Sequence, residues 1–569
     1  MRLRWLARPL FVIAFGASAC APVGPGQPGV GEQARPSQAP KLLVIGIQRE
    51  PRTLNADMAV AGDSGAAGAS AVRIIPHNFL VIDNDRGAFV PQLASEQISL
   101  ERGTWVVNAD GTMVTTWLLR PNIRWHDGTP FTSADLEFSY TVYRDPDVPT
   151  GTAALTALRH MERVDASDPL KFVIYWSQPF VRANEALGLI PLPRHALEET
   201  YRTDKSNVPN STLFHSEFLG LGPYRLARWE SGSHVEFTRF DQYFLGRPPL
   251  DTVVVRFLGD SNTMVANILS GTVDILLPIG VEVEQAMEVK QRWEGTGNVV
   301  RAELRGSIRE VNIQHRPEYA RPISGLTNQT VRQGLYHAID RQAMADVMTH
   351  GMGPVADSWF HTDHEQRRQL ERYIPQYPHD PARALLLLAQ AGWVRGSDGM
   401  LIQQSTGERF ELQISGDQSG GLEAEQNILA DGWKAVGLRM NLYIVPNALR
   451  GDPAHGDTLP GVKIGSFAAD RYYTDINHSA NISSEANRWS GRNRGGFANR
   501  RVDGLLDQLQ VTIDPGPRLA LHGELLREVL TDIARMPLYW DVDPVLYLKG
   551  VTGIQGRRPW NLLEWDKAV

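Results

Sequence analysis

The most informative stretch of this sequence is Trp117-Leu118-Leu119-Arg120-Pro121-Asn122-Ile123-Arg124-Trp125-His126-Asp127-Gly128-Thr129-Pro130-Phe131-Thr132-Ser133-Ala134-Asp135. Within it, Asp127-Gly128 is a dipeptide typical of tight turns, because Asp bonds to nearby backbone and Gly adopts positive φ without steric cost. Thr132, followed three residues later by Asp135, has the form of a helix start with a capping side chain and an acid in the first turn. The stretch therefore predicts a turn that leads into a helix, and we expect these polar side chains to support the scaffold.

On both sides of this stretch, strand-like and helix-like segments alternate. Runs of β-branched or aromatic residues bounded by turn formers predict strands at 42–45, 172–176 and 253–257. Asp380-Pro381 has the pattern of a helix start, with Gly392 at its end, and the apolar residues of 331–339 recur at helical spacing. This mixture in a long chain favours an α/β or α+β architecture with several lobes.

Composition narrows the function. The chain has 569 residues, of which 42% are hydrophobic and 21% charged, so it can bury substantial cores. Its 57 Lys and Arg stand against 64 Asp and Glu, a net charge of −7, which lacks the positive field that a nucleic-acid partner needs. The single cysteine excludes an intrachain disulfide, a Cys-based zinc site and a CxxC redox pair.

The N-terminal residues have the form of an export signal. Basic residues precede an apolar run at 10–15, which is too short to cross a bilayer, and small residues lead to Cys20. We expect residues 1–19 to be a signal peptide and Cys20 to be the lipidated first residue of the mature protein, since Ala17-Ser18-Ala19-Cys20 resembles a bacterial lipobox. A soluble secreted form stays the alternative. Residues 20–40 are rich in Pro and Gly and predict a tether between lipid and globule.

Enzyme motifs find little support. Gly62-Asp63-Ser64-Gly65 matches the tetrapeptide around a protease nucleophile, but almost no chain precedes it to supply the base. Glu282 with Glu284, and Glu423 with Glu425, are too close in sequence to face each other across a sugar. No phosphate-binding Gly-rich loop is present. We therefore predict no catalytic residues, no cofactor and no enzymatic activity.

One histidine pair suggests a metal. His361 and His364 lie three residues apart with acids nearby. Zinc needs three or four ligands on a rigid support, and the HExxH order is absent. We therefore expect a solvated polar loop here and no metal site, with nickel or haem carriage as the alternative.

A set of segments, taken in order along nearly the whole mature chain, resembles one known protein family. They are Glu50-Pro51-Arg52-Thr53-Leu54-Asn55, Pro91-Gln92-Leu93-Ala94, the Trp117 to Asp135 stretch, Pro191-Leu192-Pro193-Arg194-His195, Gly220-Leu221-Gly222-Pro223-Tyr224, Gly271-Thr272-Val273-Asp274, the helix of 331–341, and Gly496-Phe497-Ala498-Asn499 with Val502-Asp503. This order resembles the family 5 extracellular solute-binding proteins, the oligopeptide and dipeptide receptors of bacterial ABC importers. The sequence of the Gly220 to Tyr224 segment also predicts a turn.

The resemblance implies a two-lobed α/β fold, the periplasmic-binding-protein type II or Venus flytrap fold, with an extra subdomain inserted in the first lobe. The boundaries that we expect are 41–62, 220–304 and 537–569 for lobe I, 63–219 for the inserted subdomain, and 305–536 for lobe II. The chain would cross between the lobes near 302–314 and again near 537–543.

The resemblance also implies a ligand site. Receptors of this type hold the ammonium group of a peptide with an aspartate, and Asp470 occupies the matching position, with an ordinary capping or surface Asp as the alternative. Phe467, where the family often has Trp, would form an aromatic wall with Tyr472 and Tyr473. Asn312 and Trp359 are further candidates, although a Trp is more often a core residue than a ligand contact.

Three classes of function follow. The first is a peptide-binding subunit that acts with an ABC permease and ATPases, as a monomer, either lipid-anchored on the outer face of the cell membrane or in the periplasm. The second is the same fold carrying an oligosaccharide, a nickel chelate or haem. The third is a secreted hydrolase, for which no nucleophile and base set is found.

Overall fold

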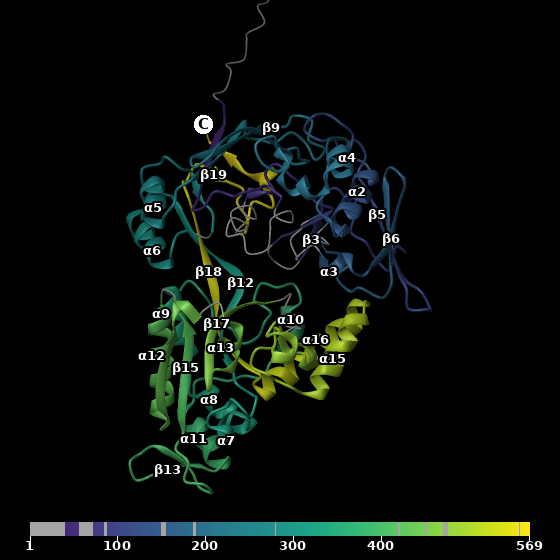
Figure 1. Ribbon diagram of the computed structural model, residues 1–569. Coiled ribbons are helices and arrows are strands. Elements are labelled where there is room, and N and C mark those ends of the chain that lie inside the picture. The colour runs from purple at the N-terminus through teal and green to yellow at the C-terminus, as the bar shows by residue number, and fades with distance from the viewer. Residues whose placement is uncertain are drawn as a thin grey trace, which may run out of the picture. The chain divides into compact units, whose positions relative to one another are not determined.

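A ten-stranded mixed sheet organises the fold in the computed structural model (Figure 1), which describes residues 40–55, 72–84, 88–148, 155–185, 189–278, 280–418, 421–449, 452–469, 476–556 and 558–568. In spatial order its strands are β16 (Arg439–Val445), β15 (Glu411–Asp417), β17 (Val462–Ala468), β12 (Val299–Ile313), β18 (Arg535–Tyr547), β11 (Ile275–Leu276), β1 (Leu42–Ile47), β10 (Thr252–Phe257), β9 (His234–Arg239) and β8 (Tyr224–Glu230). The sheet contains both parallel pairs, such as β1 with β10, and antiparallel pairs, such as β12 with β18.

The two longest strands, β12 and β18, connect the two halves of this sheet. They pair antiparallel from Val299 opposite Tyr547 to Asn312 opposite Arg535, and the register is interrupted between Leu304 and Ile308. Gly306 lies inside the interruption with φ of 73°, a conformation that side chains rarely adopt. The β12 residues after the interruption pair with β17, while β18 continues to β11. The two crossings are thus adjacent strands with a break at the same level.

The half of the sheet that contains β11, β1, β10, β9 and β8 packs against two helices. A separate two-stranded antiparallel sheet follows near the C-terminus. The helices are α5 (Ser261–Leu269) and α6 (Val283–Arg292), and the two strands are β19 (Val551–Thr552) and β20 (Asp566–Lys567). A buried cluster that includes Leu43, Val253 and Trp565 forms its core. The predicted strands at 42–45 and 253–257 are confirmed as β1 and β10.

An additional subdomain has its own sheet and its own core. The sheet consists of β4 (Trp105–Val107), β5 (Met113–Leu118), β7 (Lys171–Trp176) and β6 (Met161–Asp168), accompanied by α2 (Ser133–Arg144), α3 (Leu155–Leu158), α4 (Arg194–Thr203) and the hairpin β2 (Val81–Asp83) with β3 (Phe89–Pro91). Its cluster buries Trp117, Trp125 and Trp176 completely. The predicted strand at 172–176 is confirmed as β7.

The stretch that opened the sequence analysis folds as predicted. The Gly128 amide donates to the Trp125 carbonyl at 2.9 Å, and Gly128 has φ of 91°. Thr132 caps α2, and its amide donates to the Asp135 carboxylate at 2.9 Å. In the second predicted turn, the Gly222 amide donates to the Pro76 carbonyl at 3.0 Å. A Cβ at Gly222 would lie 2.4 Å from backbone atoms, so this glycine also permits a close chain crossing.

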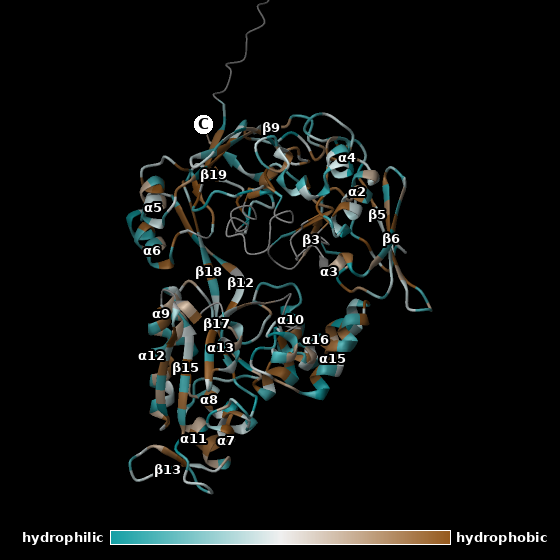
Figure 2. Cartoon of the chain, in the orientation of Figure 1, coloured by the Kyte–Doolittle hydropathy of each residue, from teal (hydrophilic) through white to brown (hydrophobic). Residues whose placement is uncertain are grey.

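The second half of the sheet carries most of the helices. They are α7 (Ile323–Leu326), α8 (Gln329–His337), α9 (Arg341–Thr349), α10 (Arg367–Leu370), α11 (Pro381–Gln390), α12 (Leu422–Ala435), α13 (Pro453–Thr458), α15 (Arg500–Val511) and α16 (Pro515–Asp532), with the hairpin β13 (Trp393–Arg395) and β14 (Leu401–Gln403). Both helices predicted here are confirmed as α8 and α11, and Asp380 accepts from the Arg383 amide at 2.8 Å. In Figure 2, α15 alternates between hydrophilic and hydrophobic colour, as its buried residues Val502 and Leu506 require.

The fold is therefore two-lobed α/β with an additional subdomain, as predicted. The numerical domain boundaries stay predictions. Among the helices that the structure describes, none combines the length and apolar character needed to cross a bilayer.

Candidate ligand-binding site

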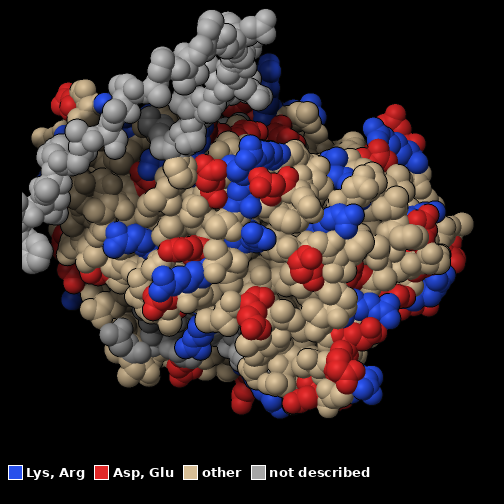
Figure 3. All heavy atoms as spheres, turned by 90° about the horizontal axis from the view of Figure 1, so that it is seen from above, with Lys and Arg blue, Asp and Glu red and all other residues tan. Residues whose placement is uncertain are grey.

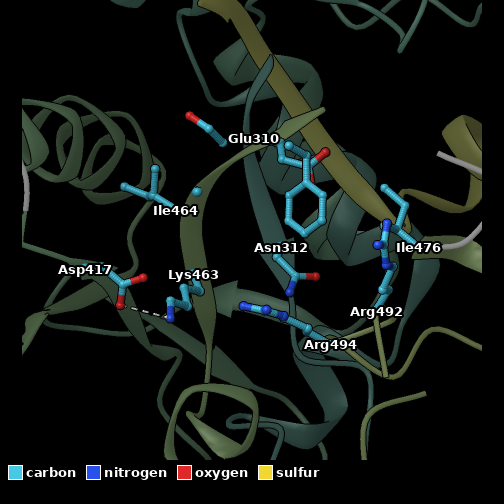
Figure 4. A pocket seen from close by; sticks show the side chains of 11 residues that line it. Glu310, Asn312, Asp417, Lys463, Ile464, Ile476, Arg492 and Arg494 are labelled. Atoms are coloured by element: carbon cyan, nitrogen blue, oxygen red, sulfur yellow. Dashed lines mark ion pairs between the residues drawn. The ribbon is translucent and has the colours of Figure 1, made fainter. Parts of the chain in front are cut away.

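A pocket of about 530 Å³ lies where β12, β17 and a later loop come together (Figure 4). Its lining comprises Glu310, Asn312, Asp417, Lys463, Ile464, Gly465, Ser466, Phe467, Ile476, Arg492 and Arg494. The volume is within the range of small-molecule sites in proteins. Acids, bases, an amide and an aromatic ring are thus gathered in one concavity.

Strand register brings five of the lining residues to one face: Glu310 and Asn312 of β12, and Lys463, Gly465 and Phe467 of β17. Asn312 lies opposite Lys463, and Glu310 lies opposite Gly465. Residues two apart on a strand share a face, so Lys463, Gly465 and Phe467 project together. A Cβ at Gly465 would meet no atom within 4 Å, which leaves open space in front of Glu310.

A buried ion pair lies on the same face, at the base of the pocket. The Arg535 Nη1 donates to Glu310 Oε1 at 2.5 Å, and the side chains are 2% and 0% exposed. Trp359 Nε1 donates to Glu310 Oε2 at 3.3 Å. Burial raises the pKa of Glu310, against the lowering influence of Arg535. The Arg535 guanidinium also lies 4.4 Å from the centre of the Phe467 ring, so the pair supports the pocket wall.

The predicted site residues separate into three groups. Phe467 and Asn312 line the pocket. Trp359 is completely buried and lies in a core cluster with Trp540 and the pocket residue Ile476, and it donates to the pocket residue Glu310. Asp470, Tyr472 and Tyr473, and the predicted lipidation site Cys20, lie outside the described residues.

The cationic side chains of the pocket were not among the site residues predicted from the sequence. Lys463 forms an ion pair with Asp417 at 3.1 Å, and Arg492 and Arg494 enter from the loop before α15. The available signal was the density of Arg and Asn in residues 483–501, which is typical of a loop but does not indicate the direction of its side chains.

The histidine pair differs from the expected solvated loop. His361 is 4% exposed and its ring centre lies 5.6 Å from that of Trp540, so the expectation of full solvation was wrong for this residue. His364 packs edge-on against Phe360 at 4.9 Å, and burial lowers its pKa to about 4. The apolar residues around Trp359 draw the loop into the core. Within the part of the chain that the structure describes, no group of three or more His, Cys, Asp or Glu side chains could hold a metal ion.

Surface charge is mixed. On the face seen in Figure 3, Lys and Arg side chains lie interspersed with Asp and Glu, and no extended basic area is visible among the described residues of that face. This face therefore lacks the continuous positive field that would attract a phosphate backbone.

Comparison with known proteins identifies relatives over nearly the full chain. Protein XP55 of Streptomyces lividans is 26% identical over 91% of this chain and 86% of its own length. The oligopeptide-binding protein AppA of Bacillus subtilis is 22% identical over 98% of this chain and 97% of its own. The chain spans most of the length of both relatives.

Solved structures share the fold. AppA of Bacillus subtilis in complex with a nonapeptide matches with a TM-score of 0.63 and 19% identity, over 93% of this chain and 100% of the other. NikZ of Campylobacter jejuni in complex with Ni(L-His) matches with a TM-score of 0.67 and 20% identity over the same shares. The family model of the bacterial extracellular solute-binding proteins, family 5, matches residues 88–484. The chain belongs to this family of bacterial extracellular solute-binding proteins.

Proposed function

We propose that the protein is the extracytoplasmic binding subunit of an ABC importer, which captures peptides and delivers them to a membrane permease. Family membership and the likeness to AppA, a relative described as oligopeptide-binding, support this function. The observation that carries the proposal is the place of the pocket. Its residues Glu310 and Asn312 follow Gly306 closely on β12, where the pairing of the two long strands is interrupted. A ligand here would contact the strand that bends when the lobes move.

The ligand would enter and leave chemically intact, so the activity is binding. Ligand-driven closure needs only a difference in affinity between open and closed states. A micromolar ligand supplies about −8 kcal/mol, enough to bias two states that differ by a few kcal/mol. The permease and ATPase partners, a monomeric state and lipid attachment through Cys20 belong to the same proposal. The partners are supported by family membership, and the lipid attachment by the export-type pattern of residues 1–19.

Within this function, Asp470 would bind the N-terminal ammonium of the peptide. An ammonium left buried without its carboxylate costs about 3 to 5 kcal/mol. We expect Asp470→Ala to weaken peptides with a free N-terminal amine more than ~100-fold, by the same conversion of free energy to affinity. Calorimetry that gives equal affinities for both proteins would remove Asp470 from the site.

Native mass spectrometry of the protein purified from its own envelope tests the function. We expect a retained series of peptide masses that disappears after denaturation and refolding. A sugar mass, or a protein that retains and binds no peptide, would contradict the proposal. Turnover of a retained peptide would show an enzyme instead.

A metal chelate is the second candidate. A solved structure of the same fold, NikA of Brucella suis, is in complex with Fe(III)-EDTA, which is an anionic chelate. The pocket is lined by three cationic side chains, Lys463, Arg492 and Arg494, of which Lys463 also pairs with Asp417. Elemental analysis of the same purified sample separates the two candidates, since a bound chelate gives about one metal ion per protein and a peptide gives none.

A further inference from the structure

The break in β12 faces one residue of β18. The strand pairing on the two sides of the break joins Leu304 to Val542 and Ile308 to Trp540. Asp541 therefore lies opposite residues 305–307 of β12. Extra residues in one strand interrupt the ladder and bend it, so the backbone here depends on other groups to hold it. The side chain of Asp541 is placed to supply one of them.

Two hydroxyl groups from different strands donate to the same oxygen of Asp541. Ser307 Oγ of β12 donates to Oδ2 at 2.7 Å, and Ser466 Oγ of β17 donates to it at 2.8 Å. A hydrogen bond to an ionised carboxylate is stronger than one between neutral groups. Ser307 directly follows Gly306, whose carbonyl accepts from the Ala469 amide at 2.9 Å. Ser307, Ser466 and Asp541 thus form a clasp that joins three strands at the far side of the break.

Arg309 and Glu425 attach this clasp to the core of the second half of the sheet. Arg309 donates from Nη1 to Ser466 Oγ at 3.1 Å and from Nε to Glu425 Oε1 at 2.8 Å. The Tyr539 hydroxyl of β18 donates to the same Glu425 oxygen. Glu425 lies on α12 and is 2% exposed, so this series of hydrogen bonds ends at a buried carboxylate. The clasp is therefore fixed to the half of the sheet that carries the pocket.

We propose that Asp541 is a positioning residue for ligand-driven closure. It fixes the far side of the break, so that β12 bends between Leu304 and Gly306 and the rest of the strand turns together with β17. The proposal rests on the closure that belongs to the proposed function, and it adds which residue decides where the chain bends. Ser466 also lines the pocket, so the strand that a ligand contacts turns with the clasp. A bend restricted to one place leaves fewer arrangements to lose on closure, which favours binding.

Pulsed electron paramagnetic resonance of the whole chain tests how freely the strands bend. One spin label is placed on each half of the sheet, at the exposed positions Glu288 of α6 and Gln390 of α11, by Glu288→Cys and Gln390→Cys in a Cys20→Ser background. The distribution of distances between the two labels is measured without added ligand. When Asp541→Ala is added, we expect this distribution to become about twice as wide, because the bend is no longer restricted to one place.

Hydrogen exchange locates the change. The amides of residues 306–309 and 541–543 should exchange about tenfold faster in Asp541→Ala, since hydrogen bonds to a charged group contribute enough to local stability for that factor. The amides of α8 should exchange at an unchanged rate, because α8 packs in the core of the second half through Val331 and Leu335. Faster exchange throughout the chain would be a general loss of stability and would overturn the proposal.

Further variants separate the clasp from the loss of an acid elsewhere. Asp503→Ala is the matched control, because Asp503 likewise accepts from a serine hydroxyl, that of Ser479, but lies on α15. It should leave the distance distribution unchanged. Ser307→Ala/Ser466→Ala removes both donors and keeps the carboxylate, so it should reproduce the wide distribution even when Asp541→Ala folds poorly. Asp541→Asn keeps one acceptor oxygen and should restore most of the narrow distribution.

The outcomes separate the clasp from the proposed function. A distribution that stays narrow in the serine double variant, or that widens equally in Asp503→Ala, overturns the role of Asp541. Both results leave the proposed peptide binding untouched, since no peptide enters the measurement. A protein that retains no peptide contradicts the proposed function, whereas a distribution widened only by loss of the clasp still supports Asp541 as the residue that restricts the bend.

Discussion

Removing either partner of the Glu310 and Arg535 pair tests whether the wall of the pocket depends on it. Both side chains are buried, and they meet at 2.5 Å. Glu310→Gln keeps the size and an acceptor for Trp359 but leaves a guanidinium that cannot lose its proton. Breaking such a pair from one side costs about 3 to 5 kcal/mol, and this cost should not change between pH 5 and 7.

Arg535→Met should behave differently, because the remaining carboxyl can take up a proton. Burial already raises the pKa of Glu310, and the variant loses the charge that lowers it. An unfolded Glu has a pKa near 4.3, so keeping the folded group neutral at pH 7 costs about 3.7 kcal/mol, at 1.36 kcal/mol per pH unit. A raised folded pKa means that stability is lost as pH rises, so the cost should fall to about 1 kcal/mol at pH 5.

Hydrogen exchange of the β12 and β18 amides, followed by mass spectrometry, measures the loss of stability in each variant. A local measurement is needed because the lobes of the chain can unfold separately. The double variant Glu310→Gln/Arg535→Met should cost less than the sum of the single variants, because neither charge is stranded. Additive costs, or an Arg535→Met cost that is the same at pH 5 and pH 7, would refute the reasoning.

The other predictions concern the glycine positions and the buried histidines. Burial lowers the pKa of His77 to about 3 and that of His126 to about 4. Because the unfolded histidines take up protons near pH 6.5, the free energy of unfolding should fall as the pH drops below that value, by about 2 kcal/mol per histidine at pH 5. Calorimetric scans at pH 7 and pH 5 that coincide would contradict this. Gly222→Ala places a Cβ 2.4 Å from backbone and should cost more than ~2 kcal/mol in thermal unfolding, whereas the control Gly504→Ala, in open space on α15, should gain about 0.5 to 1 kcal/mol. Gly306→Ala, at φ of 73°, should cost about 1 kcal/mol in the exchange of β12 amides, and no change there would show that the break in β12 relaxes freely.

Local chemistry made parts of the fold predictable. The Thr132 and Asp135 cap and the Asp380 cap of α11 depend on contacts within three residues, so the sequence pattern contains all the partners. Family resemblance extended this to the two-lobed arrangement and to Phe467 and Asn312 in the pocket.

The supports of the pocket could not be predicted in this way. Glu310 and Arg535 are separated by 225 residues. Because the pair forms only when β12 and β18 come together, no local sequence pattern predicts it. Arg316 likewise reaches the Ser483 carbonyl 167 residues away. Residue type was a poor guide for Trp359, since an aromatic ring suits a ligand and a core equally well, and only burial decides between them.

These distant contacts place the pocket beside the break in β12. Gly306 separates the part of β12 that pairs with β17 from the part that pairs only with β18, and the pocket residues Glu310 and Asn312 follow directly. Arg316, which follows this end of the strand, donates to the Arg494 carbonyl and so attaches the loop before α15 to it. Under the proposed function, a ligand that contacts both the strand and the loop binds on one side of the break, so its binding free energy would act on the equilibrium between the lobes through these residues. If the proposed function holds, the contacts that shape the pocket are therefore also the ones through which a ligand would favour closure.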